Sequence, residues 1–169
     1  MGWGALDADY YVKLDNDIEI LDPAWLRNLT NLLDSSPELG MVAHSYGDWP
    51  YAIIPTILSG GAALDSSACC NGGCVMIPRR THEKLGFWNE DYGLYGFEDL
   101  EYSERTALAG MICGYVPEKS QIRHLGYAPG TVDESHEAAK AHSIESRGRV
   151  EKLFVLNRFL FSRGLRPLY

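Results

Sequence analysis

The hydrophobic pattern along the chain predicts alternating strands and helices. Short apolar runs rich in aromatic and β-branched residues predict buried strands, and apolar residues three or four apart predict amphipathic helices. Strands are expected at 9–14, 40–44, 74–78, 112–116 and 120–124, and helices at 22–35, 79–85, 98–110 and from 135 onward. This alternation predicts an α/β fold.

Capping residues locate several helix ends. Asp22 suits an N-cap and Pro23 the first helical position, while Gly86 and Gly110 are expected to end the second and third helices. Gly148 is a candidate break in the last helix. The apolar face at 150–160 is expected to pack, with partner binding as the alternative.

The segment from Ser45 to Asn71 carries the least interpretable pattern. Trp49, Tyr51 and two prolines indicate irregular surface structure, and long irregular segments in compact domains are often binding loops or lids. An acceptor-binding loop and a plain meander both fit the sequence, so its role stays open.

Composition and charge narrow the class of protein. The chain has 169 residues, of which 46% are hydrophobic and 22% charged, as expected of one globular domain. The formal charge is -8 and the pI about 5.0, which argues against a nucleic-acid surface. A bound phosphate is therefore expected to be held through a metal rather than by a general basic field.

The start of the chain and its cysteines give no evidence of secretion or of a metal centre. The first residues lack a basic region and a long apolar run, so neither a signal peptide nor a transmembrane span is expected, and a cytoplasmic protein is the default. Free thiols are expected for such a protein. Zinc binding is the minority alternative, because no C-x-x-C pair occurs among the four cysteines, Cys69, Cys70, Cys74 and Cys113.

Two carboxylates one residue apart follow the first predicted strand. Ligands bind at the carboxyl ends of strands in open α/β sheets, and Asp15 and Asp17 fall there. Carboxylates at this spacing can both reach one hard cation. A polar turn explains the same residues, because Asp and Asn are common in turns. An EF-hand is excluded, since Ile20 and Leu26 occupy the positions of its glycine and closing glutamate.

Three other sites have both a chemical and a structural interpretation. Glu98 and Asp99 enter a helix behind Gly96, where an acid can serve as a general base but is also favoured by the helix dipole. His124 follows a strand and is either a metal ligand or a structural histidine. The pair Gly72-Gly73 either allows a close backbone approach or forms a simple turn.

The order and spacing of these motifs resemble the family 2 nucleotide-sugar glycosyltransferases of the GT-A fold. The resemblance runs from about Leu6 to Gly126 and is carried by Leu14-Asp15-Asn16-Asp17, Gly72-Gly73, Phe87-Trp88-Asn89-Glu90, Gly96-Phe97-Glu98-Asp99-Leu100-Glu101, Arg105, Gly110 and His124. It implies a truncated GT-A-like, Rossmann-like mixed sheet flanked by helices, with a C-terminal helix. We expect a single domain, with a catalytic core at 1–126 and a loop and helical segment at 127–169.

The resemblance also implies an inverting hexosyltransferase-type reaction. Asp15 and Asp17, with His124, would bind Mn²⁺ or Mg²⁺ and link it to the diphosphate of a UDP- or GDP-sugar. Asp99 would deprotonate the hydroxyl of a glycan or other acceptor, and Glu98 would help to place that acceptor. The other implied substrate-binding residues are Lys13, Asn16, Gly72, Gly73, Trp88 and Gly96.

The chain departs from the family at its start. Family members begin with a strand–helix–strand half that binds the nucleoside, and nothing before Asp9 resembles it. The sheet is therefore expected to have an uncovered edge, which favours pairing with another chain. A fragment, a shortened relative, and a chain completed by a second copy or partner all stay open. The alternative function is a non-catalytic relative that acts as a binding or interaction module. The sequence identifies neither the donor nor the acceptor.

Overall fold

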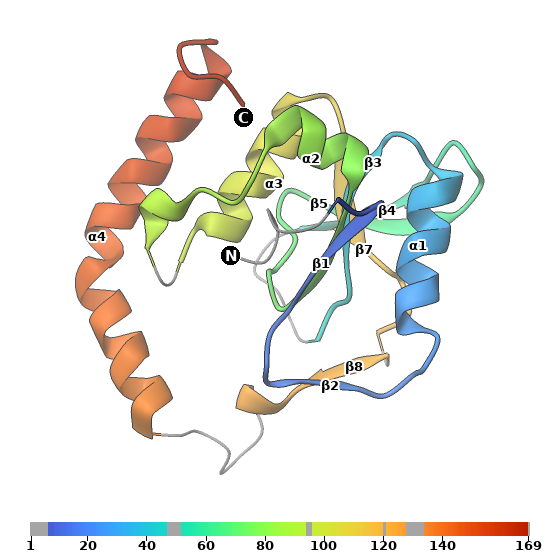
Figure 1. The fold of residues 1–169 in the computed structure, drawn as a ribbon, viewed down its shortest axis with the longest axis horizontal. Coiled ribbons are helices and arrows are strands. Elements are labelled where there is room, and N and C mark those ends of the chain that lie inside the picture. Colours follow the sequence, from blue (N-terminus) through green and yellow to red (C-terminus); the bar gives the residue numbers. More distant parts are fainter. Residues whose placement is uncertain (1–6, 47–51, 94–95, 120, 128–133, 169) are drawn as a thin grey trace.

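Six strands form the main sheet, and their hydrogen-bonded order is β1-β6-β3-β7-β5-β4 (Figure 1). The computed structural model describes residues 7–46, 52–93, 96–119, 121–127 and 134–168, and of residues 127 and 134–146 it describes the backbone alone. The strands are β1 (Tyr10–Leu14), β3 (Leu39–Ala43), β4 (Ile53–Ile57), β5 (Ala63–Ser67), β6 (Cys74–Pro78) and β7 (Ile112–Tyr115). The sheet is mixed, because β3 and β7 pair in parallel while the other neighbours pair antiparallel.

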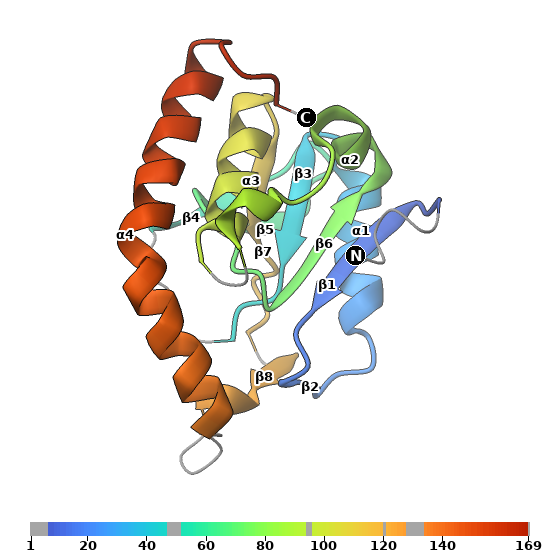
Figure 2. The same ribbon diagram turned by 60° about the vertical axis from the view of Figure 1, so that its left-hand side comes forward.

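Helices cover both faces of this sheet. The helix α1 (Trp25–Ser35) lies on one face, and α2 (Arg79–Leu85) and α3 (Glu98–Leu108) lie on the other (Figure 2). The C-terminal helix α4 (Glu134–Ser162) lies along the outer side of α3, away from the sheet. The short 3-10 helices η2 (Glu90–Tyr92) and η3 (Leu125–Tyr127) precede α3 and α4. The predicted mixed α/β class with a C-terminal helix is confirmed.

Alternate residues of the central strands build two cores. Met41 of β3 and Val75 of β6 contribute to the core under α2 and α3, whereas Val42 and Met76 contribute to the core under α1. This is the side-chain alternation that a pleated strand imposes. Both cores are made chiefly of buried apolar side chains, so both faces of the central strands are covered.

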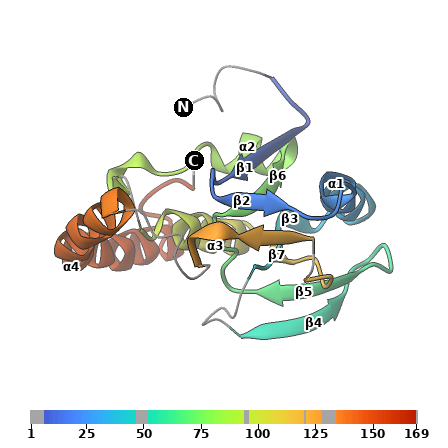
Figure 3. The same cartoon turned by 90° about the horizontal axis from the view of Figure 1, so that it is seen from below.

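A second, two-stranded sheet lies apart from the main one. It pairs β2 (Ile18–Ile20) with β8 (Ile122–His124) in antiparallel register, with Ile18 opposite His124. Figure 3 shows this pair, with β1 and β4 at opposite edges of the main sheet. The register brings the residue before β2, which is Asp17, to the end of β8. Within the described residues no strand pairs with the outer edge of β1, the edge predicted to be uncovered.

Most predicted elements agree with the structure to within a few residues. The predicted strand at 74–78 and the helix at 79–85 are confirmed, and Gly86 ends that helix with a hydrogen bond to the His82 carbonyl. The first helix begins at Trp25 rather than at Pro23. The Asp22 carboxylate accepts from the Ala24 amide and the Asp22 carbonyl from the Trp25 amide, so these residues form a turn before the helix. The helix α4 continues through Gly148 without a break.

The prediction of irregular structure at 45–71 is wrong for 53–67, where β4 and β5 form a hairpin. The strand β4 is at the sheet edge, so Ile53, Ile54 and Ile57 are exposed and lack the alternation of a half-buried strand. Pro55 is tolerated there because an edge strand can do without one ladder hydrogen bond. Part of the predicted loop, 47–51, lies outside the described residues, as do 128–133 of the loop predicted before α4.

The guanidinium of Arg105 in α3 is buried and joins four segments. It donates to the carbonyl oxygens of Leu85 at 2.6 Å, Phe87 at 2.9 Å and Leu168 at 2.8 Å. It also pairs with Glu101, one helical turn earlier, at 3.0 Å. Burial raises the pKa of Glu101, and the neighbouring Arg105 opposes that shift. Arg105 therefore fixes α3 to the end of α2 and to the C-terminal residues.

The four cysteines are buried thiols. The thiols of Cys70 and Cys113 point to backbone carbonyls, those of Gly114 and Ser103. Burial raises the pKa of Cys74 and of Cys113 to about 12. Their packing among apolar side chains accounts for these residues as small core residues.

Replacing Arg105 by methionine should lower the free energy of unfolding by about 3–5 kcal/mol, because it leaves the Glu101 carboxyl and three carbonyls without their donor. The matched control is Arg158→Met, which removes an exposed ion pair with Glu104 and should cost less than about 1 kcal/mol. Urea unfolding of both variants measures the difference. Equal losses would show that Arg105 does not anchor α3.

Candidate active site

The end of β1 and the start of β6 bring the first predicted acid to the glycine pair. The two strands are antiparallel neighbours, and the Asp15 amide donates to the Gly73 carbonyl at 2.8 Å. The Lys13 ammonium donates to the Asp15 carboxylate at 2.7 Å and to the Gly72 carbonyl at 2.7 Å. Lys13 thus holds the strand end and the glycine turn together.

The same glycine turn contacts the helix that carries the second predicted acid. The Gly72 amide donates to Oδ2 of Asp99 at 3.1 Å, while Oδ1 accepts from the Leu100 amide at 2.8 Å. A Cβ on Gly72 would lie 2.9 Å from the Lys13 ammonium and 3.5 Å from the Asp99 Cβ. The turn therefore allows one continuous chain of contacts from Asp15 through Lys13 and Gly72 to Asp99.

The backbone leading into α3 has an unusual conformation. Phe97 has a φ of 70° and Gly96 a φ of 108°, and the Gly96 amide donates to the Glu98 carboxylate at 2.8 Å. A positive φ is costly for a residue with a side chain and persists where surrounding contacts enforce it. The Phe97 ring packs on Phe154 of α4, with ring centroids 5.5 Å apart. This turn directs both Glu98 and Asp99 into the region of the glycine turn.

Burial makes both helix-entry acids more basic than usual. It raises the pKa of Asp99, and this outweighs the amide bonds from Leu100 and Gly72 and the charge of Lys13. Burial, and then the Asp99 charge, raises the pKa of Glu98. Raised carboxyl pKa values suit proton acceptors, although packing alone also produces them.

A second group forms where β2 meets β8. Nε2 of His124 lies 3.5 Å from Oδ2 of Asp17, and the Tyr46 ring packs on the His124 ring with centroids 4.7 Å apart. Glycines make this approach possible: a Cβ on Gly126 would lie 2.7 Å from the Asp17 carboxylate, and one on Gly73 would lie 2.5 Å from the Tyr46 ring. Tyr46 was not predicted from the sequence, and its position just beyond β3 is the signal that identifies it.

Asp15 and Asp17 have the chemistry of ligands for a hard cation that also binds phosphate. Asp15 and Asp17 lie on one turn, closed by a hydrogen bond from the Ile18 amide to the Asp15 carbonyl at 3.2 Å, and both are partly exposed. Mg²⁺ needs only one or two carboxylates when water and substrate phosphates complete its shell. In the described part of the chain no three His, Cys, Asp or Glu side chains converge on one point. The metal role of Asp15, Asp17 and His124 stays a prediction.

The remaining predicted residues divide between the site and the core. Asn16 is exposed on the turn between β1 and β2. Trp88 is only 8% exposed and stacks on Tyr102 with ring centroids 4.6 Å apart, within the core under α2 and α3. Packing is enough to explain Trp88, and its substrate-binding role stays a prediction.

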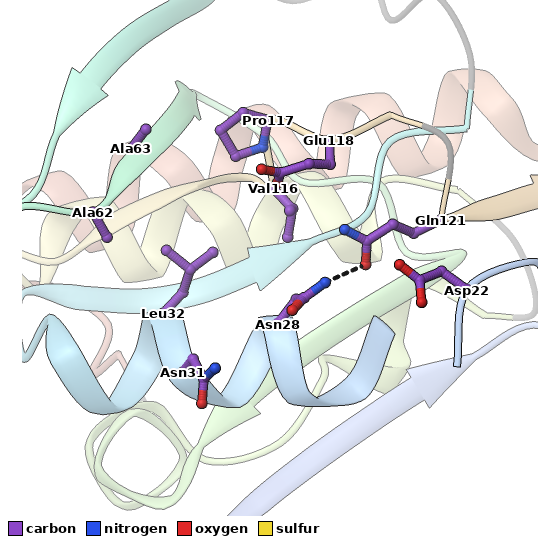
Figure 4. Close-up of a pocket in the computed structure, with 10 residues that line it drawn as sticks. All are labelled: Asp22, Asn28, Asn31, Leu32, Ala62, Ala63, Val116, Pro117, Glu118 and Gln121. Atoms are coloured by element: carbon purple, nitrogen blue, oxygen red, sulfur yellow. Dashed lines mark hydrogen bonds between the residues drawn. The ribbon is translucent and has the colours of Figure 1, made fainter. Parts of the chain in front are cut away.

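A separate cleft of about 430 Å³ lies between α1, the β4–β5 turn and the segment that joins β7 to β8 (Figure 4). Asn28 and Gln121 meet in it through a hydrogen bond of 2.9 Å. Its lining residues are Asp22, Asn28, Asn31, Leu32, Ala62, Ala63, Val116, Pro117, Glu118 and Gln121. None of them belongs to the predicted site, so this cleft does not explain the acids at the strand and helix ends.

The replacement Gly73→Ala should disturb the second group, because its Cβ would overlap the Tyr46 ring and displace it from His124. A loss of roughly 1–3 kcal/mol in unfolding free energy is expected from overpacking. Gly148→Ala is the matched control: its Cβ meets open space on a helix, so a gain of roughly 0.5–1 kcal/mol is expected. Thermal and urea unfolding test both, and a neutral Gly73→Ala would contradict the close contact.

Comparison with known proteins gives one kind of relative. No protein-family model matches the chain. A segment of 69 residues is 30% identical to the N-acetylglucosaminyl-diphospho-decaprenol L-rhamnosyltransferase of two Mycobacterium tuberculosis strains, CDC 1551 / Oshkosh and ATCC 25618 / H37Rv. The match covers 41% of this chain and 22% of that protein's length. The chain thus has a distant, partial relative among the glycosyltransferases.

No helix in the described residues is both long and apolar enough to cross a membrane.

Proposed function

We propose that the chain is a metal-dependent, inverting glycosyltransferase, or the catalytic half of one, that transfers a sugar from a nucleotide-diphosphate donor to an acceptor hydroxyl. The observation that carries the proposal is the contact chain from Asp15 through Lys13 and Gly72 to Asp99. It links Asp15 at a strand end to Asp99 at a helix entry through two intervening residues. A cation bound at that strand end and a proton acceptor at that helix entry would act on one substrate.

In this proposal Asp99 accepts the proton of the acceptor hydroxyl. Amides of Gly72 and Leu100 hold one lone pair on each of its oxygens, which fixes the orientation of the carboxylate and leaves other lone pairs for the acceptor. Its raised pKa makes it a better base than an exposed aspartate. Glu98, fixed by the Gly96 amide, lies beside it to orient the acceptor.

Asp15 and Asp17 are the residues that would hold Mn²⁺ or Mg²⁺, with His124 beside Asp17. Such a cation neutralises the charge that develops on a departing nucleoside diphosphate. The Lys13 ammonium, already paired with Asp15, supplies a positive charge next to the same turn. An acidic chain needs these local positive charges to bind a diphosphate.

The relative supports glycosyl transfer in general. The name of that protein describes L-rhamnosyl transfer to N-acetylglucosaminyl-diphospho-decaprenol. A donor panel for this chain should therefore include nucleoside-diphosphate rhamnose beside UDP- and GDP-sugars. The match spans only 22% of that protein, so donor and acceptor are to be found by experiment.

The first test is the replacement Asp99→Asn. An amide cannot accept the proton, so turnover with Mn²⁺ and the best donor should fall by roughly 10²–10⁴-fold. Glu104→Gln on the same helix is the matched control, because Glu104 pairs with Arg158 at the surface and should be dispensable. Equal turnover of Asp99→Asn and the unchanged protein would remove Asp99 as the base.

The pH dependence of the same reaction is a second test. A base must be deprotonated, so kcat/KM should fall as the pH decreases through the pKa of Asp99. Because burial raises that pKa, the midpoint should lie above 3.8, the ordinary value for aspartate. Initial rates across an acidic pH series measure it. A profile that is flat down to pH 3.8 would contradict the assignment.

The alternative is a non-catalytic relative that binds a metal or sugar nucleotide and acts as an interaction module. It is favoured by the short match to the relative and by the absence of a further strand at the β1 edge within the described residues. Calorimetry with Mn²⁺ and each donor separates the two functions. Donor binding without turnover would support the function as an interaction module. A folded protein that binds no donor would exclude the proposed glycosyltransferase activity.

A further inference from the structure

The outer face of α4 combines exposed apolar side chains with basic ones. Val155, Leu156 and Phe159 are 61%, 52% and 52% exposed. Lys152 and Arg163 are exposed beside them, because spacings of three, four and seven residues gather these five side chains on one side of a helix. Arg163 directly follows α4, keeps a helical hydrogen bond to the Phe159 carbonyl and lies over the Phe159 ring, 5.5 Å from its centroid.

The opposite face of the same helix is the one that packs. Val150, Asn157 and Phe161 are buried, and Asn157 donates to the Tyr92 hydroxyl at 3.0 Å. In Figure 1 this helix lies outside α3 with its far side away from the sheet. A single exposed apolar residue is ordinary on a protein surface. Three apolar neighbours flanked by cations offer the two kinds of contact, apolar burial and attraction to anionic lipids, through which a helix binds a membrane interface.

The C-terminal segment, residues 147–168, has a net positive charge, opposite in sign to that of the whole chain. Residues 147–168 contain six of the 15 basic residues and one of the 23 acidic residues, whereas the whole chain has a formal charge of -8. Two of the six, Arg158 and Arg166, pair with Glu104 and Asp91. The other four give an acidic protein a local basic segment, which is attracted to anionic lipid headgroups. Lysine and arginine stems can also lie along apolar surface while their charged ends reach the headgroups.

We propose that the outer face of α4, formed by Lys152, Val155, Leu156, Phe159 and Arg163, binds the surface of an anionic phospholipid membrane. The apolar side chains would lie at the boundary of headgroups and acyl chains, and the cations at the headgroups. Self-association through this face is disfavoured, because a two-fold contact would bring the cations of both copies together, and residues 147–168 contain one acid, Glu151, to oppose them. The inference rests on exposure and charge and does not depend on the proposed transfer reaction.

The test is co-sedimentation of the 169-residue chain with vesicles of phosphatidylcholine alone or mixed with phosphatidylglycerol. Binding is expected to the anionic vesicles and to weaken with added salt. Lys152→Gln and Arg163→Gln should each weaken it roughly fivefold. The pair Leu156→Ser and Phe159→Ser should weaken it roughly tenfold or more.

The matched control is the pair Ile54→Ser and Ile57→Ser on β4, whose side chains are 63% and 72% exposed on another surface and should not affect binding. Light scattering and circular dichroism show whether each variant keeps its oligomeric state and its fold. Equal binding of the α4 and β4 variants, or no binding to anionic vesicles, would overturn the proposal. So would a dimer that dissociates when Leu156 and Phe159 are replaced, which would assign this face to a second copy.

Discussion

The position of α3 depends on the buried guanidinium of Arg105. Its donors reach carbonyls at the end of α2, before η2 and near the C-terminus, and a fourth contact returns to Glu101 in the same helix. A buried pair of this kind adds little net stability, since desolvation offsets the attraction, but it strongly disfavours arrangements that leave either charge unpaired. The helix is thereby held in one place, and its first turn carries Glu98 and Asp99. The proposed chemistry at that turn depends on an ion pair that takes no part in it.

The apolar runs of β1, β3, β6 and β7, and the helix 79–85 ended by Gly86, are local signals, which is why the sequence predicts them well. Local sequence patterns do not predict strands that exist because of pairing in the folded protein. β2 has three residues and exists because β8 pairs with it, and β4 is an exposed edge strand interrupted by Pro55. In the site, the family motifs indicate Asp15, Asp17 and Asp99, and the resemblance also points to Lys13. The bridge that Lys13 makes to Gly72, and the stacking of Tyr46 on His124, follow from strand register, which a single sequence does not specify.

Charge is distributed unevenly over this acidic chain. At the strand and helix ends, carboxylates gather around one ammonium, so a diphosphate would need a cation to bind there. The C-terminal segment is basic instead, and three of its apolar side chains, those of Val155, Leu156 and Phe159, face outward. Two kinds of anionic ligand would therefore be bound by different means on the two surfaces, one through a metal and one through side-chain cations.

The strained backbone at Phe97 is supported from the far end of the chain. Its ring rests on Phe154 of α4, and the Leu168 carbonyl accepts a hydrogen bond from Arg105 in the helix that Phe97 begins. Phe154 and Leu168 thus support the helix entry, although neither belongs to the motifs that carry the resemblance. A shortened chain without α4 and the residues that follow it would keep every one of those motifs and yet lack both contacts, so the motifs alone do not determine how the start of α3 is held.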